Sequence, residues 1–262
     1  AMFRIHRQGN KVEKLRECTF RELGFREREH LQEWIAKDPA VFGEELLIIQ
    51  KEFSGFSDTN ERLDLLALDK QGSLVIIENK LDDTGRDVTW QALKYASYCS
   101  TLSKENIREI YQRFLDNTDP TQKAEQMLSD YYDESEYEDL QLNEGLSQRI
   151  ILVAAKFRKE VTSTVLWLLN YRVRVQCFRA TPFAMGDELF LNIEQIIPTQ
   201  DAEEFMVGMA DKTQDAVEHK TQSKAVDKLR REFWTNVIQT TNQKTDLYQN
   251  ISPSNYHWIG AG

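Results

Sequence analysis

The chain has 262 residues, 40% of them hydrophobic and 29% charged, and a formal net charge of −10. This composition is that of a globular protein, and the acidic balance argues against a protein coated in basic surface for binding nucleic acid. No apolar run approaches the roughly 18 residues of a membrane helix, so we expect no membrane span. The charge is uneven, however, because several arginines lie between 158 and 179. The net charge therefore does not exclude a local basic groove.

The cysteines and the N-terminal residues bear on the cellular compartment. Three cysteines, Cys18, Cys99 and Cys177, lie far apart in the sequence and form no CxxC pair. An odd number at this spacing indicates reduced thiols rather than a disulfide or a zinc site. Residues 1–15 contain no apolar segment like that of a signal peptide. We therefore expect a cytoplasmic protein without disulfides.

Hydrophobic periodicity predicts helices and strands in alternation over the first 200 residues. Residues 26–37 have helical spacing, and the pair Asp38-Pro39 ends that helix. Three strands, a second helix and a strand–helix–strand unit follow, which indicates a mixed α/β sheet flanked by helices. The predicted strands are 45–53, two in 62–83, 149–157, 173–181 and 188–198, and the later helices are 87–102, 104–115, 121–132 and 160–171.

The composition changes near residue 200. Residues 201–224 are polar and indicate a linker or a loose helix, whereas residues 227–241 have the pattern of an amphipathic helix. The sequence then ends in an apolar and aromatic stretch with little to pack on locally. We therefore expect one α/β domain over 1–200 and, over 201–262, a linker with a helical appendage that is part of a truncated second domain.

The stretch RLDLLALDKQGSLVIIENKLDD, residues 62–83, places charged side chains inside two apolar strands. A three-residue loop at 70–72 would pair Asp69 with Ser73, and the same count sets Asp64 opposite Glu78. Lys80 shares the face of Glu78, because side chains two apart in a strand point to the same side. Ionised groups in a core cost several kcal/mol each unless they are compensated.

Two carboxylates without His or Cys suit a hard cation such as Mg²⁺ or Mn²⁺, which would offset their repulsion. The backbone carbonyl of Asn79, between Glu78 and Lys80, is a further candidate ligand. Lys80 would orient a water and stabilise developing negative charge, as metal-assisted phosphodiester hydrolysis requires. The alternative interpretation is an ion-paired cluster at a sheet edge.

The motif formed by Asp64 and Glu78-Asn79-Lys80 resembles the core of the PD-(D/E)XK nuclease superfamily, in the branch similar to RecB and to the catalytic domain of NucS endonucleases. The middle residue of that Glu-X-Lys motif is usually apolar, and here it is Asn79, whose side chain should point away from a metal. The stretch QALKY resembles the QxxxY element of the same branch and supplies two residues one helical turn apart, Gln91 and Tyr95.

The stretch EREHLQEWIAKDPAVFGEELLII resembles the helix and turn that precede the motif in this branch and carry an additional catalytic glutamate. The resemblance makes Glu29 and Glu33 the candidates, at i and i+4 on one helical face, with Glu45 as a weaker alternative. Arg86 and Lys94, near the same face, are candidate phosphate contacts.

The resemblance implies a restriction-endonuclease-like fold and a Mg²⁺- or Mn²⁺-dependent endodeoxyribonuclease of bacterial repair or defence type, with DNA as its partner. The DNA-binding N-terminal domain of NucS proteins has no counterpart here, so its substrate preference does not carry over. The tail resembles the start of a bacterial C-terminal domain family of unknown function. The rival hypothesis is a catalytically silent module with the nuclease fold that acts through partners. The sequence does not decide between a monomer and a homodimer.

Overall fold

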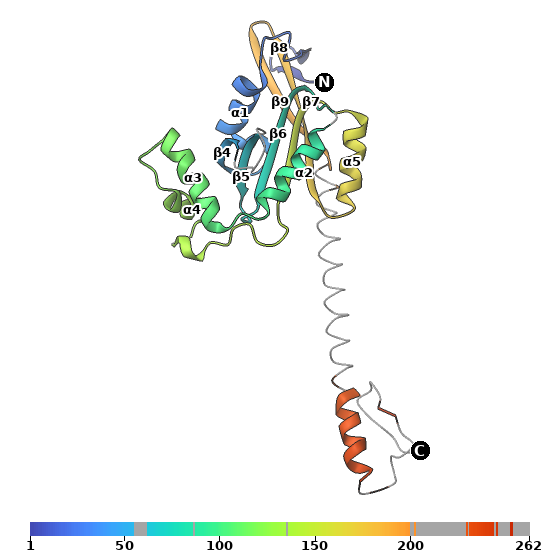
Figure 1. Cartoon of the computed structure of the whole chain (residues 1–262). Helices are drawn as coiled ribbons and strands as arrows, with labels where there is room; N and C mark the ends of the chain where they lie inside the picture. Colours follow the sequence, from blue (N-terminus) through green and yellow to red (C-terminus); the bar gives the residue numbers. More distant parts are fainter. Residues whose placement is uncertain are drawn as a thin grey trace. The chain divides into compact units, whose positions relative to one another are not determined.

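The computed structural model describes residues 1–54, 62–85, 87–134 and 136–199, and beyond them residues 202, 229, 231–243, 245 and 252–253. The chain divides into two units, Ala1–Thr199 and Gln200–Gly262. Residues 231–241 of the second unit are helical, within the range predicted for the appendage. Apart from Ala202, the predicted linker lies outside the described residues. Figure 1 shows the first unit as a mixed α/β domain.

A seven-stranded mixed sheet forms the centre of the first unit, in the order β3-β8-β7-β6-β5-β4, with β9 paired to β8. Its strands are β3 Arg16–Glu17, β4 Leu46–Phe53, β5 Leu63–Asp69, β6 Leu74–Asp83, β7 Arg149–Lys156, β8 Arg174–Met185 and β9 Glu188–Ile197. Strands β4 to β6 form an antiparallel meander, while β6, β7 and β8 run parallel. A separate two-stranded ribbon joins β1 Phe3–His6 and β2 Lys11–Lys14.

Helices cover both faces of the sheet, which confirms the predicted α/β architecture. The helical segments are η1 Glu27–Leu31, α1 Gln32–Lys37, η2 Pro39–Phe42, α2 Val88–Cys99, α3 Lys104–Thr118, α4 Ala124–Tyr132, η3 Tyr137–Asp139 and α5 Lys159–Leu169. On one face, η1 and α1 bury Leu31 and Ile35, respectively, against β5 to β8. On the other face, α2, α3, α4 and α5 pack against the same sheet.

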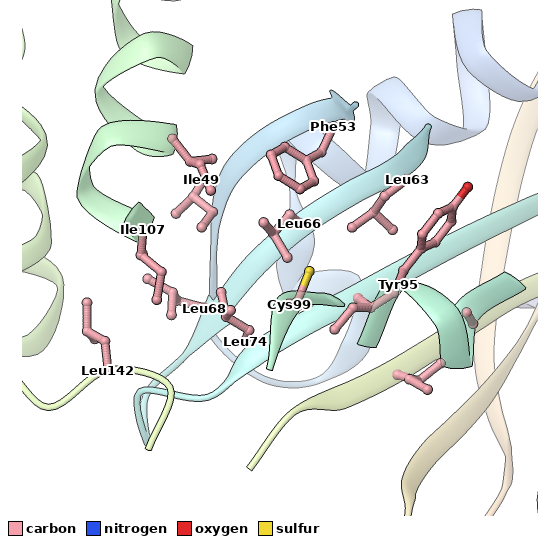
Figure 2. Packing of buried hydrophobic residues seen from close by; sticks show 14 of the residues in the cluster. Ile49, Phe53, Leu63, Leu66, Leu68, Leu74, Tyr95, Cys99, Ile107 and Leu142 are labelled. Carbon is pink, nitrogen blue, oxygen red and sulfur yellow. The ribbon is translucent and has the colours of Figure 1, made fainter. Parts of the chain in front are cut away.

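The core under α2 is built from alternate residues of the central strands. Figure 2 shows Tyr95 and Cys99 of α2 packed with Leu66, Leu68 and Leu74 of β5 and β6. The neighbouring positions in those strands, among them Leu65 and Ile77, belong to the core under α1. This two-sided burial explains why the hairpin reads as two nearly continuous apolar runs.

The hairpin between β5 and β6 has the register expected from the sequence. Leu65 pairs with Ile77 and Leu68 with Leu74, and the Asp69 amide donates to the Ser73 carbonyl at 3.1 Å. Gly72 closes the turn at φ +79°, where an added β-carbon would lie 2.2 Å from the Gln141 carbonyl oxygen. Only glycine fits this position. The same count sets Asp64 opposite Glu78, and β6 is a central strand, as predicted.

Two further expectations concern the thiols and the membrane. Cys18, Cys99 and Cys177 are all buried and free. Burial raises the pKa of the Cys99 thiol and of the Cys177 thiol to about 12, so both stay protonated at neutral pH. In the part of the chain that the structure describes, no helix is both long enough and apolar enough to traverse a bilayer.

Candidate active site

Two buried carboxylates meet where β5 and β6 lie side by side. Glu78 is completely buried, and Asp64 is 4% exposed. The Asn79 backbone amide donates to Asp64 Oδ2 at 2.8 Å. Neither carboxylate oxygen of Glu78 has a hydrogen-bond partner, although both are buried. The sequence therefore places an unsatisfied acid directly opposite a second acid in the core.

The surroundings favour the protonated form of both groups. Burial raises the pKa of Glu78 well above its usual range, and the charge of Asp64 raises it further. Burial likewise raises the pKa of Asp64, although the Asn79 amide and the Lys80 charge lower it. Loss of hydration outweighs the nearby positive charge, so the two groups resist ionising together. A cation between them would reverse this balance.

Lys80 is the positive charge that accompanies the pair. Its Nζ lies 3.8 Å from Glu78 Oε2 and 3.7 Å from Glu27 Oε1, and 27% of its side chain is exposed. The Glu27 carboxylate is fixed in turn, because its Oε2 accepts the Leu81 amide at 2.8 Å. Lys80 therefore reaches solvent beside the buried acids, with its ammonium group at ion-pair distance from both Glu27 and Glu78.

The structure brings Glu27 to the site, and not the two glutamates expected from the resemblance. Glu29 pairs with Arg26 at 2.8 Å and has 59% of its side chain exposed. Glu33 pairs with Lys51 at 2.7 Å. Helical geometry explains the difference, since residues two positions from a buried residue lie on the far side of the helix.

A sequence signal for Glu27 was available. It lies four residues before Leu31, and Leu31 lies four before Ile35, so the three share the buried face of the helix. The weaker candidate, Glu45, pairs with Lys70 at 3.2 Å with 71% of its side chain exposed. That salt bridge adjoins the hairpin turn, at the opposite end of β5 from Asp64.

Gln91 and Tyr95 support the strand that carries Asp64. Gln91 Nε2 donates to the Tyr95 hydroxyl at 3.0 Å, and that hydroxyl donates to the Arg62 carbonyl at 3.1 Å. Arg62 lies two residues before Asp64, and Tyr95 is completely buried. In Figure 2 the Tyr95 hydroxyl points out of the apolar cluster. The geometry makes this pair a brace for the backbone at the site.

Three predicted site residues remain, namely Lys94, Arg86 and Asn79. Lys94 Nζ lies 5.7 Å from the centroid of the Tyr95 ring, beside the brace. Arg86 lies outside the described residues. The Asn79 side chain is fully buried, and its amide oxygen and nitrogen have no hydrogen-bond partner. Strand alternation sets it on the α1 face with Ile77, away from Asp64 and Glu78, as expected.

The donor set fits a small divalent cation. Mg²⁺ is commonly held by one or two carboxylates and completes its octahedron with water and phosphate oxygens. The two unhydrogen-bonded oxygens of Glu78 beside Asp64 offer such a ligand pair. Within the described residues, no group of three or more His, Cys, Asp or Glu side chains has the spacing of a metal cage. The two carboxylates would leave the other coordination positions of such a cation to water and phosphate oxygens.

Comparison with protein-family models and with curated proteins gave no match. The fold is similar to a solved repair endonuclease from Pyrococcus abyssi, with a TM-score of 0.32, 16% identity, and coverage of 58% of this chain and 46% of that one. It is also similar to a structure of an EndoMS–dsDNA2 complex, with a TM-score of 0.32, 15% identity, and coverage of 58% and 44%. The chain thus spans less than half the length of either structure. Similarity this low says nothing about activity, which has to come from the site.

Proposed function

We propose that the first unit is a metal-dependent nuclease that hydrolyses phosphodiester bonds in DNA. The observation that carries the proposal is the Glu78 carboxylate, which is buried and without a hydrogen bond, opposite Asp64 and beside Lys80. An arrangement that disfavours the ionised state of two acids costs stability, and such costs are concentrated at functional sites. A cation, a nucleophilic water and a phosphate together would satisfy every group in it.

Each residue has a separate task in this proposal. Asp64, Glu78 and the Asn79 carbonyl would hold Mg²⁺ or Mn²⁺, which supplies Lewis acidity and lowers the pKa of a bound water. Lys80 would orient the attacking water and stabilise negative charge as the phosphorus–oxygen bond breaks. Glu27 would fix the Lys80 ammonium group, and the proton lost by the water would pass to solvent at the exposed side.

The supporting residues would keep this geometry during the reaction. Gln91 and Tyr95 would hold the Asp64 strand through the Arg62 carbonyl. Arg86 and Lys94 would contact the phosphates that flank the scissile bond. We place the protein in the cytoplasm, in DNA repair or defence, as the sequence suggests. The 201–262 segment would belong to a second domain.

A second candidate function is a module that kept the fold and lost the chemistry. The observation in its favour is that Lys80 lies within ion-pair distance of both Glu27 and Glu78, which offers the acids a protein partner. The net charge of −10 also fits a protein that binds partners other than bare DNA. Removal of the lysine separates the two candidates.

The test is a cleavage assay on single-stranded, duplex and branched DNA with Mg²⁺ or Mn²⁺, for wild type, Lys80→Met and the control Lys70→Met. Lys70 pairs with exposed Glu45 at the other end of β5. We expect Lys80→Met to lower cleavage about a hundredfold or more and Lys70→Met to leave it unchanged. A wild-type protein that cleaves none of these substrates with either metal contradicts the proposal and favours the silent module.

A further inference from the structure

A third acid lies in line with the two at the site. The pairing of β4 with β5 sets Gln50 against Leu66, Lys51 against Leu65 and Phe53 against Leu63. By the same count, Glu52 lies opposite Asp64, which in turn lies opposite Glu78. Glu52 also raises the pKa of Asp64 through its charge. Nothing in the sequence pattern singles out this residue.

The backbone at Glu52 has an unfavourable conformation. Its φ is +51°, in the left-handed region, just after a register shift in β4 between Ile48 and Gln50. Side chains with a β-carbon are strained there, whereas glycine adopts this conformation freely. A strained non-glycine residue beside a candidate active site suggests that its side chain is needed.

The Glu52 side chain connects the N-terminal helix to the catalytic strand. Gln32 Nε2 donates to Glu52 Oε1 at 3.0 Å and also approaches the Asp64 carbonyl at 3.2 Å. Arg28 Nε lies 3.3 Å from the same Glu52 oxygen. Gln32 is 2% exposed, and Glu52 Oε2 is buried without a hydrogen bond. Arg28 lies within η1, directly after Glu27, and Gln32 is the first residue after that turn.

We propose that Glu52 is a positioning residue that holds Gln32, and with it the helical turn carrying Glu27, against the backbone of Asp64. This inference rests on the nuclease function proposed above and extends it to a residue outside the Asp and Glu-X-Lys motif. Glu52 touches neither Lys80 nor the scissile phosphate in this account. It acts on the reaction through the placement of Glu27, which fixes the Lys80 ammonium group.

The experiment uses the full chain with Glu52→Gly, Glu52→Gln and the control Asp133→Gly. Asp133 has φ +57° at the end of α4, far along the chain from the site, so it reports the effect of relieving the backbone alone. Glycine removes the side chain and the strain together, whereas glutamine keeps an oxygen that accepts from Gln32. For each variant, melting temperature, kcat, KM for DNA and hydrogen exchange of residues 26–32 are measured.

We expect both Glu52→Gly and Asp133→Gly to melt at or above the wild-type temperature, and only Glu52→Gly to lose kcat, about tenfold to a hundredfold. Glu52→Gln should keep most of the kcat, KM should change little, and exchange in 26–32 should rise only in Glu52→Gly. A Glu52→Gly protein with wild-type kcat and unchanged exchange overturns the proposal. Wild type without cleavage overturns the nuclease function instead, and the exchange of 26–32 then decides the role of Glu52.

Discussion

Strand β5 has a buried aspartate near each end, and the two have opposite surroundings. Asp69 is fully buried and accepts the Arg149 guanidinium at 3.0 Å and the Ser73 amide at 2.9 Å. Arg149 is satisfied in turn by Glu44 and Gln176, both within 2.7 Å. At the other end, Asp64 faces Glu78, whose two oxygens accept no hydrogen bond and, among the described residues, have only the Lys80 ammonium group nearby, at 3.8 Å. One acid cluster is completed by the protein, and the other is left incomplete.

The difference between the two ends of β5 helps to distinguish a charged group that serves the fold from one that serves a function. Buried polar groups in native proteins are nearly always hydrogen-bonded, so a satisfied cluster needs no explanation beyond folding. An unsatisfied one costs stability and persists where another molecule completes it. Mutations should therefore have opposite consequences at the two ends of β5.

The largest expected effect is on cleavage by Glu78→Gln, which keeps the shape of the side chain and removes its charge. We expect cleavage to fall by about a thousandfold or more, because a metal ligand is lost. In chelator at neutral pH the variant should be as stable as wild type or more stable, by roughly 1 kcal/mol, since the repulsion with Asp64 disappears. Cleavage assays and thermal melts measure the two effects.

The matched control is Glu29→Gln, the same change on the exposed side of η1. It should leave both cleavage and stability close to wild type. If Glu78 is instead the ion-pair partner of Lys80, Glu78→Gln lowers the melting temperature in chelator. That drop, together with no response of wild type to Mn²⁺, would falsify the catalytic-metal account.

At the other end of β5, Arg149→Ala should lower the free energy of unfolding by about 3–5 kcal/mol, because it leaves two acids without their buried partner. Chemical denaturation measures this loss. Arg158→Ala is the control, since Arg158 pairs with Asp83 at 2.6 Å but both side chains are more than a third exposed. We expect that change to cost at most about 1 kcal/mol. Equal losses of the free energy of unfolding in Arg149→Ala and Arg158→Ala would contradict the view that the buried Arg149 cluster stabilises the fold.

The hairpin geometry was predictable because it depends on local rules. A two-residue period and a three-residue turn fix the register from Asp69 to Ser73, and hence the meeting of Asp64 with Glu78. The brace formed by Gln91 and Tyr95 follows from i and i+4 spacing, although its anchor at the Arg62 carbonyl does not. Local periodicity thus gives the fold class, the sheet meander and the centre of the site.

The rest depends on contacts between distant segments. The Arg149 cluster joins residues 80 and 105 positions apart, and nothing near Arg149 in the sequence marks its partners. The helical face that carries Glu27 could have been read from Leu31, but its approach to Lys80 depends on how η1 meets the end of β6. The left-handed conformation of Glu52, two residues beyond a register shift in β4, likewise leaves no signal in residue types.

An intermediate effect is expected from metal addition to the Asp64–Glu78 pair. A cation that binds only the folded state at about a hundredfold above its Kd stabilises by roughly 2.7 kcal/mol. Mn²⁺ should therefore raise the melting temperature of wild type and of Arg158→Ala, and should not raise that of Glu78→Gln. Thermal melts in chelator and in a Mn²⁺ series measure this. An equal response in Glu78→Gln would place the cation elsewhere in the protein.

The smallest expected effect is the pH dependence of the metal-free protein, which isolates the repulsion itself. Burial and mutual charge raise the folded-state pKa of Asp64 and of Glu78, whereas in the unfolded chain both return to about 4. The folded state then holds protons that the unfolded state releases. The stability from this pair is complete below the unfolded pKa and is lost as pH rises through the raised folded values, at up to about 1.4 kcal/mol per pH unit for each proton.

Other carboxyl groups change the stability of the fold with pH in the opposite direction, but at lower pH. Glu22, Asp83 and Asp119 have lowered pKa values from hydrogen bonds to neighbouring residues, so their contribution is lost only as pH falls below the ordinary carboxyl range. Between about pH 5 and about pH 8 the Asp64–Glu78 pair should therefore dominate among the carboxyl groups. Denaturant unfolding in chelator across this range should show wild-type stability falling with pH and Glu78→Gln falling less steeply. Parallel curves for the two proteins would mean that the acids at this end of β5 are already compensated within the protein, as those at the Arg149 end are.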